Sequence, residues 1–173
     1  MNKEIWEIWL EDENRRKSDF SNYLKFKKIK IEEEKDELVK GHLQKADHNL
    51  KFVKSTLDLK EFNDWAIVSS YYAIYHASLS LCALKGYSTK DHNATLLILI
   101  KEFYGKKISY EDIKMVSTSA IEKEDILYYV DARTERKKAS YSTKMIFEQN
   151  EAEILGLKAI NFVNKVKEII HNL

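Results

Sequence analysis

The sequence predicts an all-α protein: an up-and-down helical bundle of four to five core helices that carries an N-terminal helical appendage. The 173 residues include no proline and only four glycines, so long uninterrupted helices fit better than a sheet rich in turns. Residues 65–84 carry no charge in a chain of which 33% is charged. In several other stretches apolar residues recur at alternating intervals of three and four, as they do on one face of a helix.

The uncharged stretch 65–84 is the expected core of the bundle. A helix of this length could also span a bilayer. Its four serines, three tyrosines and His76 argue against a span, because lipid offers such groups no hydrogen-bond partner. We therefore expect a central helix that other helices enclose, and no association with a membrane.

Length and charge limit the remaining possibilities. The chain is long enough for one domain with a sizeable core, which we divide into the appendage, residues 1–34, and the bundle, residues 35–173. Its formal net charge is +1, so binding to nucleic acid would require a local patch. The single cysteine, Cys82, falls in the apolar stretch and predicts a buried thiol. With no signal peptide at the N-terminus, we expect a cytoplasmic protein.

The first thirty residues predict two helices. Residues 2–12 resemble a short amphipathic helix whose Trp6 and Trp9 dock on the chain's own helices, with a contact to a partner chain as the alternative. Residues 15–30 are rich in lysine and arginine. Three aromatic residues lie among them at intervals of three: Phe20, Tyr23 and Phe26. We favour a solvated helix with a packed aromatic stripe over an RNA surface, since a run of acids at 32–37 follows directly.

The bundle itself is expected to begin with a helix at 35–59, whose heptad-like stripe requires an antiparallel neighbour. After a short break at 60–63 and the central helix, Gly86 is expected to end that helix in the left-handed conformation. Ser88 or Thr89 can cap a helix at 91–104, which Gly105 stops. A short helix at 110–117, a further helical pattern from residue 120 and a closing helix at 148–173 complete the prediction.

Residues that could carry chemistry are few. No cysteine pair, glycine-rich phosphate loop or nucleophile elbow is present, and the five histidines are dispersed, so we expect no metal and no cofactor. His76 is predicted to serve packing rather than catalysis. The candidate is a segment in which cations stand beside two hydroxyls, and a phosphate could bind there: Arg133, Arg136, Lys137, Lys138, Ser140 and Tyr141. A solvated basic helix end is an equally good interpretation of the spacing.

Three stretches together resemble the HEPN domains (higher eukaryotes and prokaryotes nucleotide-binding). They are WAIVSSYYAIYHASLSLCALKGY, then STKDHNATLLILI, and RTERKKASY. The resemblance covers roughly residues 35–173. It implies a homodimeric helical bundle, encoded with a small nucleotidyltransferase as a toxin and antitoxin pair. Active members are metal-independent endoribonucleases in which a histidine takes the proton of the RNA 2′-hydroxyl and an arginine stabilises the phosphorane.

The family's motif transfers only in part. Arg133 matches the arginine, with Arg136 as the alternative, and Tyr141 matches the tyrosine to which the partner enzyme attaches AMP in some members. Ala139 stands where the family has its histidine. Because loss of a general base costs roughly 10²- to 10⁴-fold in rate, the resemblance implies binding of a nucleotide or RNA phosphate rather than turnover. A non-catalytic protein-interaction or scaffold bundle and an active endoribonuclease are the alternatives.

Overall fold

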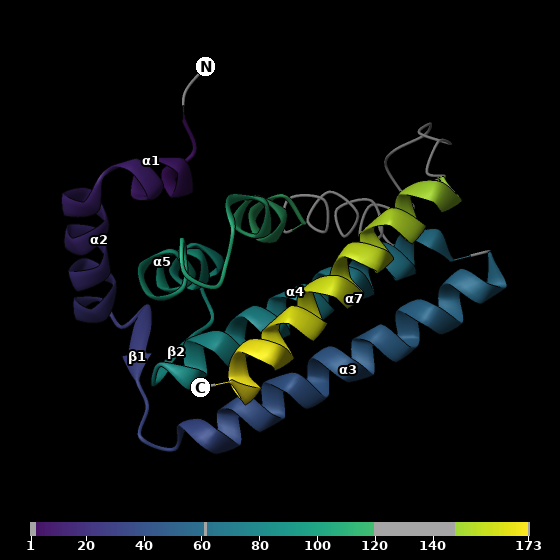
Figure 1. Ribbon diagram of the computed structural model, residues 1–173, viewed down its shortest axis with the longest axis horizontal. Coiled ribbons are helices and arrows are strands. Elements are labelled where there is room, and N and C mark those ends of the chain that lie inside the picture. Colours follow the sequence, from purple (N-terminus) through teal and green to yellow (C-terminus); the bar gives the residue numbers. More distant parts are fainter. Residues whose placement is uncertain (1–2, 61, 120–147, 173) are drawn as a thin grey trace, which may run out of the picture.

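The protein is an all-α helical bundle, as predicted. The structure, a computed structural model, describes residues 3–60, 62–119 and 148–172. Three long helices lie side by side (Figure 1), and shorter elements gather at one side of them. The long helices are α3 (Lys35–Leu59), α4 (Asn63–Leu84) and α7 (Gln149–His171). The shorter elements are α1 (Ile5–Glu11), α2 (Glu13–Lys25), β1 (Ile29–Ile31), β2 (Tyr87–Thr89) and α5 (His92–Glu102), with a helical segment at 110–119.

Helix α4 is the central helix that the uncharged stretch predicted. It packs against α3, α7 and α5, and its residues from Ala66 to Tyr71 are all buried. Buried serine hydroxyls donate to carbonyl oxygens of the same helix, such as Ser70 to Ala66 at 2.8 Å and Ser78 to Ile74 at 2.9 Å, so they lie in the core without unsatisfied donors. By length and hydropathy α4 could also cross a membrane, but 78% of its most apolar window is buried within the protein.

A glycine allows α7 to lie close to α3. A Cβ atom built on Gly156 would come within 3.2 Å of the side chains of both Val53 and Leu57. Leu57 and Val53 belong to the apolar stripe of α3 that required a neighbour. Two helices fill this role, because α3 packs against both α4 and α7.

The N-terminal helices dock on the chain's own helices. Trp9 is fully buried and its Nε1 donates to Asp19 at 2.8 Å. Trp6 is 5% exposed and its ring lies 5.6 Å from that of Tyr110, centroid to centroid. Both α1 and α2 pack against α5, and β1 pairs with β2. The expected docking of the two tryptophans is thus confirmed, while the division of the chain at residues 34 and 35 stays a prediction.

The region 26–31 differs from the predicted helix. Helix α2 ends at Lys25, Lys27 has a φ of 57°, and β1 pairs antiparallel with β2, with Ile29 opposite Thr89. Ile29 is 1% exposed, so the small sheet is held by burial of one side chain. Strands of three residues are too short for a periodic pattern to predict them.

The helix boundaries after α4 are close to the prediction, with one wrong cap. Gly86 and Gly105 have φ of 76° and 74°, as the predicted stops require. Ser88 and Thr89 belong to β2, however, and the N-cap of α5 is Asp91, whose carboxylate accepts from the backbone N–H of Ala94 at 2.9 Å. Helix α5 ends at Glu102 rather than 104, and the helical segment that begins at residue 110 continues to at least 119.

Candidate phosphate-binding region

The predicted phosphate-binding residues lie outside the described residues. All six fall within 120–147, so their assignment stays a prediction: Arg133, Arg136, Lys137, Lys138, Ser140 and Tyr141. The chain enters this stretch after Ser119 and leaves it before Glu148. The surroundings of these two positions are therefore the part of the site that the structure describes.

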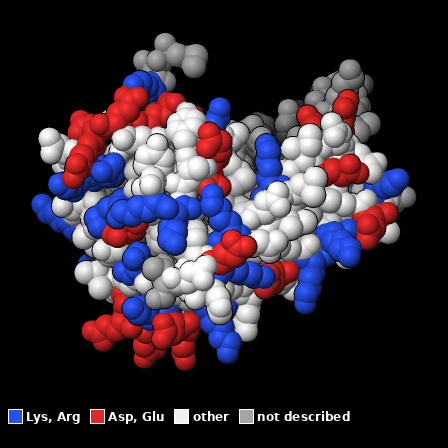
Figure 2. All heavy atoms as spheres, in the orientation of Figure 1, with Lys and Arg blue, Asp and Glu red and all other residues white. Residues whose placement is uncertain are grey.

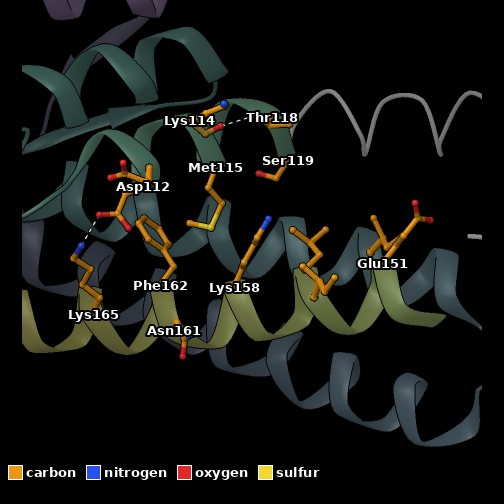
Figure 3. A pocket seen from close by; sticks show the side chains of 14 residues that line it. Asp112, Lys114, Met115, Thr118, Ser119, Glu151, Lys158, Asn161, Phe162 and Lys165 are labelled. Carbon is orange, nitrogen blue, oxygen red and sulfur yellow. Dashed lines mark hydrogen bonds and ion pairs between the residues drawn. The ribbon is translucent and has the colours of Figure 1, made fainter. Parts of the chain in front are cut away.

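A cleft lies next to Ser119 and the first turn of α7. It has a volume of about 1040 Å³ and lies between the helical segment 110–119 and α7. Figure 3 shows Met115 pointing down from the first segment and Lys158 and Phe162 pointing up from α7, while Asn161 points away. Ser119 and Glu151 line the cleft at the end from which the chain continues. The floor is apolar, formed by residues that include Ile67, Met115, Leu155 and Phe162.

The charges in the cleft are mixed and partly neutralised. Lys165 Nζ lies 2.5 Å from Asp112 Oδ2, and the same carboxylate accepts from the backbone N–H of Ser109 at 2.8 Å. Asp112 is therefore fixed at the start of the helical segment. Lys114 and Lys158 also line the cleft, and within the described residues neither has an acidic side chain within 4.0 Å. Glu111 and Glu151 line the cleft as well, so the lining holds three lysines and three carboxylates around an apolar floor.

A histidine pair joins α3 to α4. His42 Nδ1 lies 3.1 Å from His76 Nδ1, and the two rings are stacked at 27°. Desolvation by burial lowers the pKa of His76 to about 4, with the His42 ring and the Lys45 ammonium as smaller causes. Burial also lowers the pKa of His42. At neutral pH both rings are uncharged, and one donates its Nδ1–H to the other, which agrees with the predicted packing role of His76.

The sequence did not reveal this pair. The two histidines are 34 residues apart, and only the crossing of α3 and α4 brings them together. A third histidine, His92, lies at the start of α5 with its ring 6.0 Å from that of Tyr75. The YYAIYHA stretch thus contributes an aromatic cluster between helices. The close spacing of aromatic residues along this helix is the feature of the sequence that indicates the cluster.

Within the described residues, no group of three or more His, Cys, Asp or Glu side chains could hold a metal ion. Cys82 is fully buried in α4, and burial raises the pKa of its thiol far above the usual range. A thiol in this state is a poor nucleophile and a poor ligand.

The structure places the protein among the all-α helical bundles. It has three long helices, short N-terminal helices that dock on the others, and a cleft lined by lysines and carboxylates. No family model matches the chain. Over 147 residues the chain is 26% identical to a protein of Methanocaldococcus jannaschii that carries the name "Putative toxin MJ0142". The matched region covers 85% of this chain and 88% of that protein, so the similarity extends over nearly the whole of both.

Proposed function

We propose that the chain is a HEPN-like component of a toxin and antitoxin pair that binds the phosphate of a nucleotide or of RNA. Arg133, with Arg136 and Lys137, supplies the charge, and Lys138, Ser140 and Tyr141 stand beside them. The protein acts in the cytoplasm as a homodimer, together with a nucleotidyltransferase-type partner. The following steps support the proposal.

The toxin role is supported by the similarity to the Methanocaldococcus protein. The match is not confined to one helix, because it spans 85% of this chain. A helical bundle of this kind also agrees with the architecture that the HEPN resemblance implies.

The observation that carries the binding proposal is the position of the cleft. Ser119, which directly precedes the arginine-bearing stretch 120–147, lines it, as does Glu151 in the first turn of the helix that follows that stretch. Lys114 and Lys158 line the same cleft, together with Glu111 and Glu151. A planar guanidinium can bind two phosphate oxygens at once, and ammonium groups strengthen such a site as point charges.

Binding is favoured over cleavage because the general base of the family's motif is missing. Ala139 replaces the family's histidine, and a methyl group cannot take a proton from a 2′-hydroxyl. His42 and His76 contact each other through their Nδ1 atoms at 3.1 Å and serve in packing. Tyr141 has a hydroxyl that a nucleotidyltransferase could adenylylate: its oxygen attacks the α-phosphate of ATP, loses its proton and displaces pyrophosphate. Such a modification would add a negative charge beside the arginines and weaken phosphate binding.

A titration with a labelled oligouridine RNA tests the proposal. We expect salt-dependent binding by the purified wild-type protein, and weaker binding by the triple variant R133A/R136A/K137A. Because each phosphate contact contributes about 0.7 to the slope of log K against log salt for single strands, the slope should weaken by about 2. Labelled ATP offers phosphates without an RNA strand, and the triple variant should bind it more weakly than the wild type does.

The control variant replaces lysines on the exposed side of α3, Lys51 and Lys54, by alanine and should leave the slope nearly unchanged. Equal binding by wild-type protein and triple variant would refute the phosphate site. Cleavage of the RNA by the protein alone, abolished by Arg133→Ala, would establish the endoribonuclease instead. A toxin role further predicts that induced expression slows bacterial growth and that the triple variant does so less.

A further inference from the structure

The turn between α2 and β1 presents an aromatic ring to solvent. Phe26, the C-cap residue of α2, is 70% exposed. The aromatic stripe expected on this helix would have packed it beside Phe20 and Tyr23. Phe20 is 7% exposed, and its ring lies 5.4 Å from that of Tyr87, while Tyr23 contacts Trp9 edge-on at 6.2 Å. Core packing thus explains the first two rings of the stripe and leaves the third without a structural role.

Three exposed lysines lie close to Phe26 in the sequence. Lys25, Lys27 and Lys30 lie within five residues of one another, and we call them, together with Phe26, the basic turn. Among the residues that the structure describes, none of the three has a carboxylate within 4.0 Å. Lys25 Nζ lies 5.9 Å from the centroid of the Phe26 ring. The basic turn therefore combines unneutralised charge with a free aromatic face.

The neighbouring charges are already engaged. Lys28 Nζ pairs with Asp91 Oδ2 at 3.0 Å and lies 4.8 Å above the Tyr23 ring. Glu32, the first acid of the run that follows, accepts from the Ser88 hydroxyl at 2.5 Å. Figure 2 shows basic side chains over the region of α2, and a separate group of acidic side chains below it, where the chain enters α3. The acidic run 32–37 thus follows the basic turn directly in the chain.

The basic turn is also held in one conformation. The N–H of Phe26 donates to the Asn22 carbonyl at 2.9 Å, that of Lys27 to Leu24 at 3.1 Å and that of Lys28 to Tyr23 at 2.9 Å. Lys27 keeps a φ of 57°, and the next strand is anchored by the buried Ile29. The backbone that carries the ring therefore need not reorganise when a ligand stacks on Phe26.

We propose that the basic turn binds a single-stranded nucleic acid, with phosphates on Lys25, Lys27 and Lys30 and a base stacked on Phe26. Alternating cations and an exposed ring are the elements by which proteins hold single strands without reading their sequence. An anionic membrane is the competing ligand, since Ile31 is also 73% exposed. A planar surface would approach the acidic run together with the lysines, whereas a flexible strand can follow the lysines alone. This site is separate from the arginine segment of the proposed function and goes beyond it.

The test is a titration of the full chain with labelled oligouridine, using two variants. Phe26→Ala should weaken binding roughly tenfold, the typical effect of removing one stacking platform. The variant K25Q/K27Q/K30Q should reduce the salt slope by about 2, or about 0.7 for each lost contact. The matched control K40Q/K51Q/K54Q removes the same charge from the exposed surface of α3 and should leave affinity and slope near the wild-type values. Thermal melting checks that all variants fold, as the exposure of these side chains leads us to expect.

Two results would overturn the inference. If both basic-turn variants bind the RNA as the wild type does, the site does not exist, and the arginine segment can still be judged from its own variant. If they retain RNA binding but lose binding to vesicles of equal parts phosphatidylcholine and phosphatidylserine, the basic turn is a membrane contact. Conversely, loss of binding in the basic-turn variants with no effect of R133A/R136A/K137A would support this inference and refute the proposed function.

Discussion

Replacing Trp9 by alanine should lower the free energy of unfolding by about 3 to 5 kcal/mol, the range found for large aromatic residues in a core. Trp9 is 0% exposed, packs edge-on against Tyr23 and donates to Asp19. The substitution removes the ring, leaves a cavity between α1 and α2 and takes one donor from a half-buried carboxylate. Urea unfolding followed by far-ultraviolet circular dichroism measures the change.

Trp65 is the matched control. It is also a tryptophan on a helix, but it is 44% exposed on α4, so Trp65→Ala should change the free energy of unfolding by about 1 kcal/mol or less. The form of the Trp9 transition also tests the predicted division at residues 34 and 35. A single transition shifted as a whole would mean that residues 1–34 unfold together with the bundle. A small early transition, followed by one at the wild-type position, would show that the N-terminal part unfolds independently.

The histidine pair should make the protein less stable in acid. The pKa of His76 is about 4 in the folded protein, against 6.5 as its ordinary value, so between these pH values the unfolded chain binds more protons than the folded one. Stability is therefore fully present above pH 6.5 and is lost as the pH falls through this window. A displacement of this size would correspond to about 3 kcal/mol for a fully buried ring, and solvent screening at the half-buried His76 makes the loss smaller.

Carboxylates titrate in the same range, so the comparison must be made with a variant. His76→Phe keeps an aromatic ring against α3 but has no proton to gain. The difference in unfolding free energy between wild type and variant should shift in favour of the variant as the pH falls from 6.5 to 4, and should be constant above 6.5. A difference that does not change with pH would show that His76 is protonated equally well in both states.

Patterns of long range along the chain predicted the main helices well. Residues 35–59 were expected as a helix, and α3 has these bounds, because its apolar stripe repeats over many turns. The uncharged stretch predicted α4 to within two residues, and the closing helix predicted at 148–173 is α7. In these elements local propensity and burial require the same structure, so the sequence alone suffices.

Features that depend on contacts between distant residues were not predicted. The β1–β2 pair forms because Ile29 is buried next to a strand that follows α4, and no local pattern specifies it. The cap of α5 was assigned to Ser88 or Thr89, but pairing with β1 removes these residues from the helix start and leaves Asp91 as the cap. The His42–His76 contact likewise requires two helices to cross. For the arginine segment, the sequence supplies the residue types, and their positions in space stay a prediction.

The buried thiol of Cys82 can report how often the bundle opens. It is the sole cysteine of the chain, its side chain is fully enclosed in α4, and burial suppresses its thiolate. A thiol reagent can therefore modify the native protein only during the moments when the central helix separates from its neighbours. Mass spectrometry can follow the added mass of the reagent directly. The rate of modification then reports how often the bundle opens. A bound ligand that holds the helices together would lower the rate of Cys82 modification in proportion to its occupancy.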